Sequence, residues 1–225
     1  MMDSLLHLLQ ISDSAFPTGS FAHSSGFEAA IQRSFLLNED ATVQFLYAIL
    51  ENMSSQLAPF VREAYNSWPD IQKVVRLDRK LAATLNNHIA RRASKQQGRS
   101  LVQTACAIYD SRSLEELREL IYEGKLEAHQ PIIYGAVCAH LAIPEDSTLT
   151  SFLSSALRNT MASAVRLGRV GSLEAQKMQF RLQKAIPGMI DRNKERPAEA
   201  ACTTFPLVDI LHSSHDLLFM RMFYS

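Results

Sequence analysis

The 225-residue chain contains 47% hydrophobic and 20% charged residues, and its 23 Lys and Arg balance its 23 Asp and Glu. This composition is typical of a globular protein and excludes a disordered or collagen-like chain. The zero net charge lacks the basic surplus of a dedicated nucleic-acid binder, and no apolar run reaches the ~20 residues of a membrane helix. Cys106, Cys138 and Cys202 lie far apart, which predicts reduced thiols in a cytoplasmic protein.

Helical periodicity dominates the chain. Asn38 and Asp40 are candidate N-caps for the first long helix, and the polar break at residues 67–70 separates two further helices. Pro144 terminates a later one. Helices are expected around residues 43–57, 74–85, 101–109, 114–122 and 133–141.

The clearest apolar stripe covers residues 149–165 and includes Leu157, which we expect to be a core residue. Gly168 is expected just past the end of this helix with a positive φ, and Arg166 is expected to stabilise the carbonyls of its last turn. After another helix over residues 175–185, the polar segment from Pro187 to Pro197 predicts the longest loop.

No segment alternates between polar and apolar residues as a strand would. The sequence therefore predicts an all-α fold, a single-domain helical bundle of roughly eight to ten helices over residues 1–225. The last part of the chain, at about residues 209–225, is expected to be a separate tail on this domain.

The sequence contains no catalytic signature. The nucleophile elbow, the phosphate-binding loop, the dinucleotide fingerprint and the zinc-protease motif are all absent. We therefore expect a protein that is not an enzyme and that hydrolyses nothing in isolation.

Two histidines near the end of the chain are weak candidates for a metal site. His212 and His215 are three residues apart, so that both could lie on adjacent helical turns, and such a pair suits zinc or nickel. Alternatively, Ser213 or Ser214 caps the last helix and the histidines make polar contacts. The corresponding alternative function is a metal-binding helical protein.

A basic stripe is expected on one helix face, where Arg91, Lys95 and Arg99 repeat every four residues beside Arg92. It could hold phosphate, but no aromatic residues interleave with it. A solvated face or a patch for an acidic protein partner is the favoured interpretation.

Residues 12–28 combine small hydroxyl residues with Gly19, Gly26 and three phenylalanines, which predicts a packed loop rather than a floppy linker. This segment opens a series of five blocks, in order along the chain, that resembles the UreF family of urease accessory proteins. Residues 66–87 match weakly. The motif residues that carry the resemblance are Ser12, Asp13, Gly19, His23, Gly26, Glu28, Gln97, Gly98, Arg99, His129, Gly135, Arg166, Gly168 and Gln176, followed by the terminal block over residues 206–225.

The resemblance implies a non-enzymatic adaptor, or chaperone, in urease maturation. Its partners would be a UreD-like (UreH-like) accessory protein, the GTPase UreG and the urease apoprotein, and it would form a homodimer within the complex. Nickel would be the cargo of the assembly rather than a cofactor of this chain. Neither nucleic acid nor a membrane is an expected partner.

The C-terminal tail is expected to be the docking element for the UreD-like partner, because it concentrates apolar side chains at a chain end. The alternative is that the tail packs on its own domain. Docking predicts that deleting residues 219–225 leaves a folded chain that no longer binds its partner, whereas packing on the own domain predicts that the truncated chain unfolds. The partner-binding residues implied are Asp209, His215, Arg221, Phe223, Tyr224 and Ser225.

Overall fold

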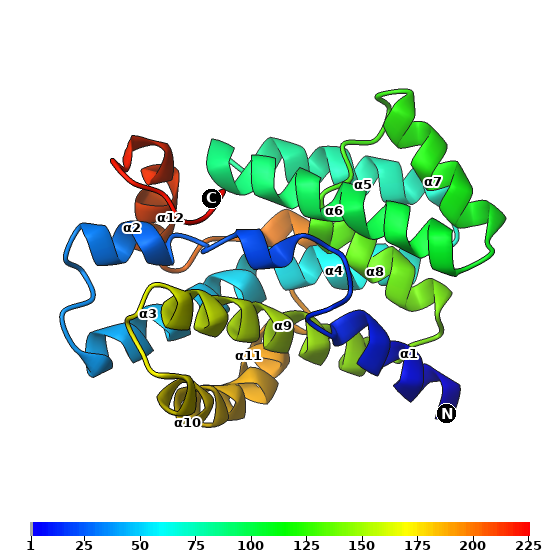
Figure 1. Cartoon of the computed structure of the whole chain (residues 1–225). Helices are drawn as coiled ribbons and strands as arrows, with labels where there is room; N and C mark the ends of the chain where they lie inside the picture. The colour runs from blue at the N-terminus through cyan, green and yellow to red at the C-terminus, as the bar shows by residue number, and fades with distance from the viewer. Residues whose placement is uncertain (1) are drawn as a thin grey trace.

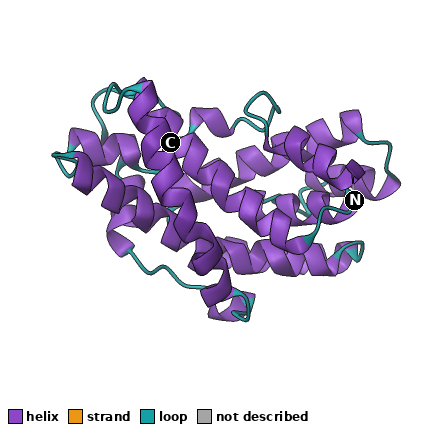
Figure 2. Cartoon of the chain, turned by 90° about the horizontal axis from the view of Figure 1, so that it is seen from below, coloured by secondary structure: helices purple, strands orange, loops and turns teal. Residues whose placement is uncertain are grey.

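The computed structural model describes residues 2–225, which form an all-α fold with no strand in this range (Figures 1 and 2). The α-helices are α1 (Met2–Ser12), α2 (Phe27–Gln32), α3 (Glu39–Asn52), α4 (Ala58–Ser67), α5 (Ile71–Thr84), α6 (His88–Ile108), α7 (Arg112–Tyr122), α8 (Gln130–His140), α9 (Glu145–Arg166), α10 (Ser172–Leu182), α11 (Ile186–Asn193) and α12 (Pro206–Ser213). A π-turn, η2 (Met53–Leu57), joins α3 to α4, and the 3₁₀ turns are η1 (Ser20–Ala22), η3 (Gln183–Ala185), η4 (Ala198–Ala200) and η5 (His215–Leu217). The predicted fold class is confirmed.

Polar side chains start several of these helices. Asn38 Oδ1 accepts a hydrogen bond from Ala41 N at 2.8 Å, and Asp70 Oδ1 accepts one from Lys73 N at 3.1 Å. These bonds satisfy N–H groups that have no partner inside the helix. The expectation for Asn38 is confirmed, whereas Asp40 lies inside the first turn of α3, where its negative charge suits the helix dipole.

The core consists of two clusters that share α9. One cluster lies among α4, α5, α6, α7, α8 and the first half of α9, and the other lies among α2, α3, α10, α12 and the second half of α9. Met53, in the π-turn, packs against both clusters. Helices α4 and α8 can approach closely because Gly135 has no side chain. A Cβ at this position would lie only 2.2 Å from Val61 O. Figure 1 shows the helices of these two clusters side by side as the two halves of the fold, with α1 projecting at the lower right.

The expected long loop over residues 187–197 is wrong, because helix α11 occupies most of it. Pro187 lies in the first turn, where its missing N–H breaks no hydrogen bond. Ile186, Met189 and Asn193 are buried at steps of three and four, so this polar segment nevertheless buries one helical face.

Leu157 lies on the buried face of α9 and is 2% exposed, as its stripe predicted. Leu157→Ala is expected to lower the free energy of unfolding by about 2–5 kcal/mol, because it removes buried methyl groups and leaves a cavity. Urea denaturation would measure this loss, with exposed Leu173→Ala on α10 as the matched control. A loss for Leu157→Ala no larger than that for Leu173→Ala would contradict its burial.

The end of α9 is a left-handed cap at Gly168, as predicted. Gly168 has a φ of 66°, Gly168 N donates to Val165 O and Arg169 N donates to Ala164 O, each at 2.9 Å. Gly168→Ala is expected to destabilise the chain by about 1–2 kcal/mol, because an L side chain disfavours this φ. Nothing lies within 4 Å of the added Cβ, so a loss well above that range in thermal unfolding would point to a clash instead.

Candidate functional site

The C-terminal tail leaves α12 through the 3₁₀ turn η5 and then runs without helix over residues 218–225. Figure 1 shows it folding back over α2 and the start of α6. The expected capping of the last α-helix by Ser213 or Ser214 is wrong, because these serines lie at its C-terminal end.

Glu28, on α2, holds the backbone of the tail. Its Oε1 accepts a hydrogen bond from Met222 N at 2.7 Å, and its Oε2 accepts one from Phe223 N at 3.2 Å. His215 Nε2 donates to Phe223 O at 3.2 Å, and its Nδ1 lies 3.9 Å from Glu28 Oε2. Glu28 and His215 are both buried. The backbone N–H groups of Met222 and Phe223 therefore donate to a buried side chain rather than to carbonyl groups of a helix.

The end of the tail is fixed to the loop before α2. Ser24 N and Ser24 Oγ both donate to Ser225 O, at 2.6 and 3.1 Å, and His23 Nδ1 lies 2.6 Å from Ser225 Oγ. Tyr224 N donates to Ala22 O at 2.8 Å. Residues 22–28 and 222–225 therefore form one hydrogen-bonded unit.

Gly26 allows α2 to lie against α12. Its φ is 85°, and a Cβ there would lie 3.0 Å from His212 Cβ. A larger residue would push apart the two segments on which the tail unit rests. The predicted packed loop over residues 12–28 is thus confirmed at this end.

Arg166 has a different role from the one expected at the end of α9. Its guanidinium lies 4.0 Å from the centre of the Phe21 ring and 4.2 Å from that of Phe223. Its NH1 group donates to Phe21 O at 2.7 Å. Arg166 therefore clamps Phe223 onto the N-terminal loop through cation–π contacts, rather than satisfying the carbonyls of its own helix.

The anchored tail presents apolar side chains to solvent. Leu217, Phe219, Met220 and Met222 are exposed, and Phe219 is 98% exposed. We call these four residues the tail surface. Because the hydrogen bonds above fix the backbone on both sides, this surface is preformed rather than frayed.

The partner-binding residues expected in the tail divide into two groups. Arg221 and Tyr224 are exposed, whereas His215, Phe223 and Ser225 are buried in this chain's own domain. Asp209 lies between these groups: it is partly buried and accepts a hydrogen bond from Thr203 Oγ1 at 3.2 Å. The alternative, packing of the tail on its own domain, therefore applies to His215, Phe223 and Ser225. The apolar residues of the tail surface are the ones left exposed.

A second polar cluster fixes the loop between α7 and α8. The carboxylate of Asp78, on α5, accepts hydrogen bonds from the backbone N–H groups of Glu127, Ala128 and His129, at 2.8, 3.1 and 2.7 Å. Gly98, on α6, packs against this loop, since a Cβ at this position would lie only 1.9 Å from Ala128 O. Burial raises the pKa of Asp78 against these hydrogen bonds, which stabilise its charged form.

Asp78 was not predicted from the sequence. One signal was available: it is an acidic residue on the apolar stripe of residues 74–85, and a buried carboxylate requires donors. Asp78 thus connects the motif residues Gly98 and His129, which come from two separate blocks of the chain.

The remaining motif residues have separate places. Ser12 ends α1, Asp13 Oδ1 accepts from Ala15 N at 2.7 Å, and Gly19 has a positive φ. Gln176 and Arg99 are exposed on α10 and α6. The structure therefore does not bring all motif residues to one site.

A cleft of 460 Å³ lies between the two halves of the fold and is lined by residues of α3, α6, α8, α9 and α12, among them Gln97. His23, Arg158 and His212 line it, and the buried atoms His23 Nε2, Arg158 Nε and His212 Nε2 have no protein hydrogen-bond partner. Burial and nearby positive groups lower the pKa of His23 to about 4 and that of His212 to about 3. The imidazoles are therefore neutral at pH 7.

Neither candidate metal ligand is joined to further ligands. His215 Nε2 donates its proton to Phe223 O, and within residues 2–225 no three His, Cys, Asp or Glu side chains are arranged to hold a metal ion. His215 makes the polar contact that the alternative interpretation expected, whereas His212 Nε2 has no protein hydrogen-bond partner.

The stability of the fold is expected to fall as the pH decreases from 7.5 to 5. Unfolded histidines titrate near pH 6.5, but burial holds the pKa of His23 and His129 at about 4 and that of His212 at about 3. Unfolding therefore takes up protons in this window, so acid stabilises the unfolded state. Burial raises the pKa of Asp78 and Asp209, which subtracts from the effect.

Urea midpoints at several pH values would measure this dependence. His212→Gln is expected to flatten it by up to one proton, about 1.4 kcal/mol per pH unit, whereas exposed His88→Gln is the matched control. Equal slopes for His212→Gln and the unmodified chain would contradict the burial of a neutral imidazole.

These features define an all-α protein with an exposed apolar tail surface on an anchored backbone. In a comparison with known protein families, the UreF family model matches residues 36–183 of this chain. The urease accessory protein F of Oryza sativa subsp. japonica is 35% identical over 222 residues, which cover 98% of this chain and 85% of that protein. The protein of the same name from Arabidopsis thaliana is 35% identical over 218 residues, covering 96% and 90%. UreF of Trichodesmium erythraeum is 28% identical over 223 residues, covering 97% and 95%.

The chain belongs to the UreF family of urease accessory proteins. This membership gives it a role in urease maturation, and an accessory role points to a non-catalytic protein. No helix within residues 2–225 is long and apolar enough to cross a membrane.

Proposed function

We propose that this chain is the adaptor that joins a UreD-like accessory protein and the GTPase UreG for nickel insertion into the urease apoprotein. The tail surface is the docking element for the UreD-like partner. A second copy of the chain belongs to the proposed complex. Nickel is the cargo of the assembly, and we assign no ligand for it in this chain.

The observation that carries the proposal is an exposed apolar surface on an anchored backbone. Buried area contributes ~25 cal/mol per Å², and an ordered surface spends less of this gain on conformational entropy. Phe219 and Met220 project into solvent from a segment whose neighbours are bonded to Glu28 and Ser24. Large apolar and aromatic side chains of this kind are typical binding hot spots.

Co-purification tests the proposal. The tagged chain is co-expressed with the UreD-like protein, the GTPase and urease of its own organism. We expect the chain to capture the two accessory proteins and urease to become active in medium with nickel. Phe219→Asp is expected to remove the UreD-like partner from the captured complex, whereas Leu37→Asp, at a leucine that is 75% exposed outside the tail, is expected to retain it.

Retention of the UreD-like partner by a folded Phe219→Asp variant would overturn the docking role of the tail. If the unmodified chain captures neither accessory protein, the adaptor function itself is wrong.

A further inference from the structure

The outer face of α6 carries a concentration of positive charge next to the tail. A shallow, open groove of 390 Å³, lined by residues of α6 alone, runs along the helix from His88 to Gln103, a length of about 22 Å at 1.5 Å per residue. Five cationic side chains border it or its tail end, and two carboxylates face them: Arg91, Arg92, Lys95, Arg99 and Arg221 against Asp216 and Glu127.

The pairing within this face leaves positive charge unbalanced. Asp216 is shared between Arg92 and Arg221, at 3.0 Å from each. Arg91 spends its donors on the carbonyl of Leu85, which does not neutralise its charge. Arg99 is exposed and, within residues 2–225, has no carboxylate within 4.0 Å, so its guanidinium is available to a partner.

The positive charges of α6 also affect the pKa values of neighbouring side chains. His129 lies under α6, and repulsion from Lys95, Arg91 and Arg99 contributes, after burial, to its low pKa of about 4. Lys95 also lowers the pKa of Glu127, whose carboxylate it holds at 2.9 Å. The positive groups therefore act together on one region of a chain whose net charge is zero.

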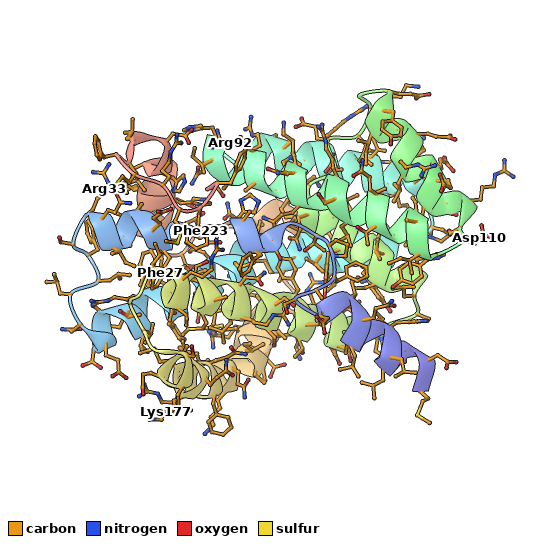
Figure 3. The ribbon with its side chains drawn as sticks, viewed as in Figure 1. Phe27, Arg33, Arg92, Asp110, Lys177 and Phe223 are labelled. Carbon is orange, nitrogen blue, oxygen red and sulfur yellow. The ribbon has the colours of Figure 1, made fainter. Side chains whose placement is uncertain are left out.

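The basic face is continuous with the tail surface. Arg92 contacts Asp216 in the turn η5 and lies 5.5 Å from the centre of the Tyr224 ring. Figure 3 shows Arg92 near the start of α6 beside the tail, with Phe223 below it. A partner that covers Phe219 and Met220 would thus reach the start of the groove.

We propose that α6 binds an acidic segment of the protein that docks on the tail surface, with Arg99 and Lys95 as its main charge contacts. The proposal rests on the tail-docking function proposed above. The cations recur at helical steps of three and four, so an acidic helix laid along the groove can place a carboxylate opposite each. Guanidinium groups suit such carboxylates because they donate two parallel hydrogen bonds. The amides of Gln96 and Gln103 also border the groove.

A graded charge series on the full chain tests the proposal, with the affinity for the purified UreD-like partner as readout. Arg99→Glu is expected to weaken binding about five- to tenfold, mainly through slower association, and Arg99→Gln is expected to weaken it less. Gln96→Lys, at an exposed neutral position, is expected to strengthen binding about two- to threefold. A folding defect cannot produce a gain, so the pair of signs separates charge from stability.

Lys194→Glu, an equal charge reversal at an exposed lysine outside the groove, is the matched control and should change the affinity less than twofold. The differences should nearly disappear at 0.5 M salt, because screening is strong there. A 20-bp DNA duplex is the second probe, and we expect it to bind more weakly than the partner and without this order of variants.

Equal partner affinity across the charge series, with Phe219→Asp still disruptive, would overturn the acidic-segment proposal and leave the tail function intact. If neither Phe219→Asp nor the series changes the affinity, both proposals are wrong. If DNA binding follows the charge series and partner binding does not, the face is a nucleic-acid site and the proposal is also overturned.

Discussion

Asp78→Ala is expected to lower the free energy of unfolding by about 3–5 kcal/mol, since it leaves two buried and one partly buried backbone N–H group without acceptors. Those groups belong to Glu127, Ala128 and His129, and they hold the loop that packs on Gly98. A loss of this size is a large share of the 5–15 kcal/mol of an ordinary domain. Urea denaturation at pH 7.5, followed by circular dichroism, would measure it.

Asp110→Ala is the matched control, because Asp110 is exposed and Figure 3 shows it at the far end of the helical pair α6–α7. It should change stability by less than about 0.5 kcal/mol. Asp78→Asn keeps one acceptor oxygen and should fall between the two. An Asp78→Ala variant as stable as Asp110→Ala would show that the loop does not depend on this carboxylate.

Removing residues 219–225 is expected to destabilise the fold by about 3–5 kcal/mol, in contrast to the sequence-based expectation of an intact truncated chain. The deletion removes the buried Phe223 ring and takes from Glu28 the two N–H groups that its carboxylate accepts from. A buried carboxylate without donors is strongly unfavourable. The drop in melting temperature would report the loss.

Phe219→Asp is the control for this experiment. It alters the most exposed side chain of the tail and none of the anchoring hydrogen bonds, so its melting temperature should equal that of the unmodified chain. A truncated chain that melts with it would contradict the anchoring role of Phe223 and Glu28.

The fold class could be predicted from helical periodicity, because an apolar stripe such as that of Leu157 is a local pattern that indicates a helix with one buried face. The Gly168 cap was predictable for a similar reason: positive φ and a helix end are local properties. Helix α11 was missed because its polar surface hides the three-residue spacing of Ile186 and Met189, and burial of that face is a tertiary effect.

The candidate site was predictable only as a region. The apolar crowding near the end of the chain marked the tail, but Glu28 lies 194 residues from Met222, and no local pattern joins them. Arg166 was assigned to its own helix for the same reason, since its contacts to Phe21 and Phe223 depend on long-range packing. Those contacts decide which tail residues are buried anchors and which face solvent.

The dissociation constant between the purified chain and the UreD-like partner tests the central claim most directly. Calorimetric titration of the unmodified chain, Phe219→Asp and Leu37→Asp compares one tail-surface side chain with one exposed leucine elsewhere. We expect Phe219→Asp to weaken binding at least about thirtyfold, corresponding to the 2 kcal/mol or more of a hot spot, with Leu37→Asp unchanged. Equal affinities for all three folded chains would contradict docking through the tail surface.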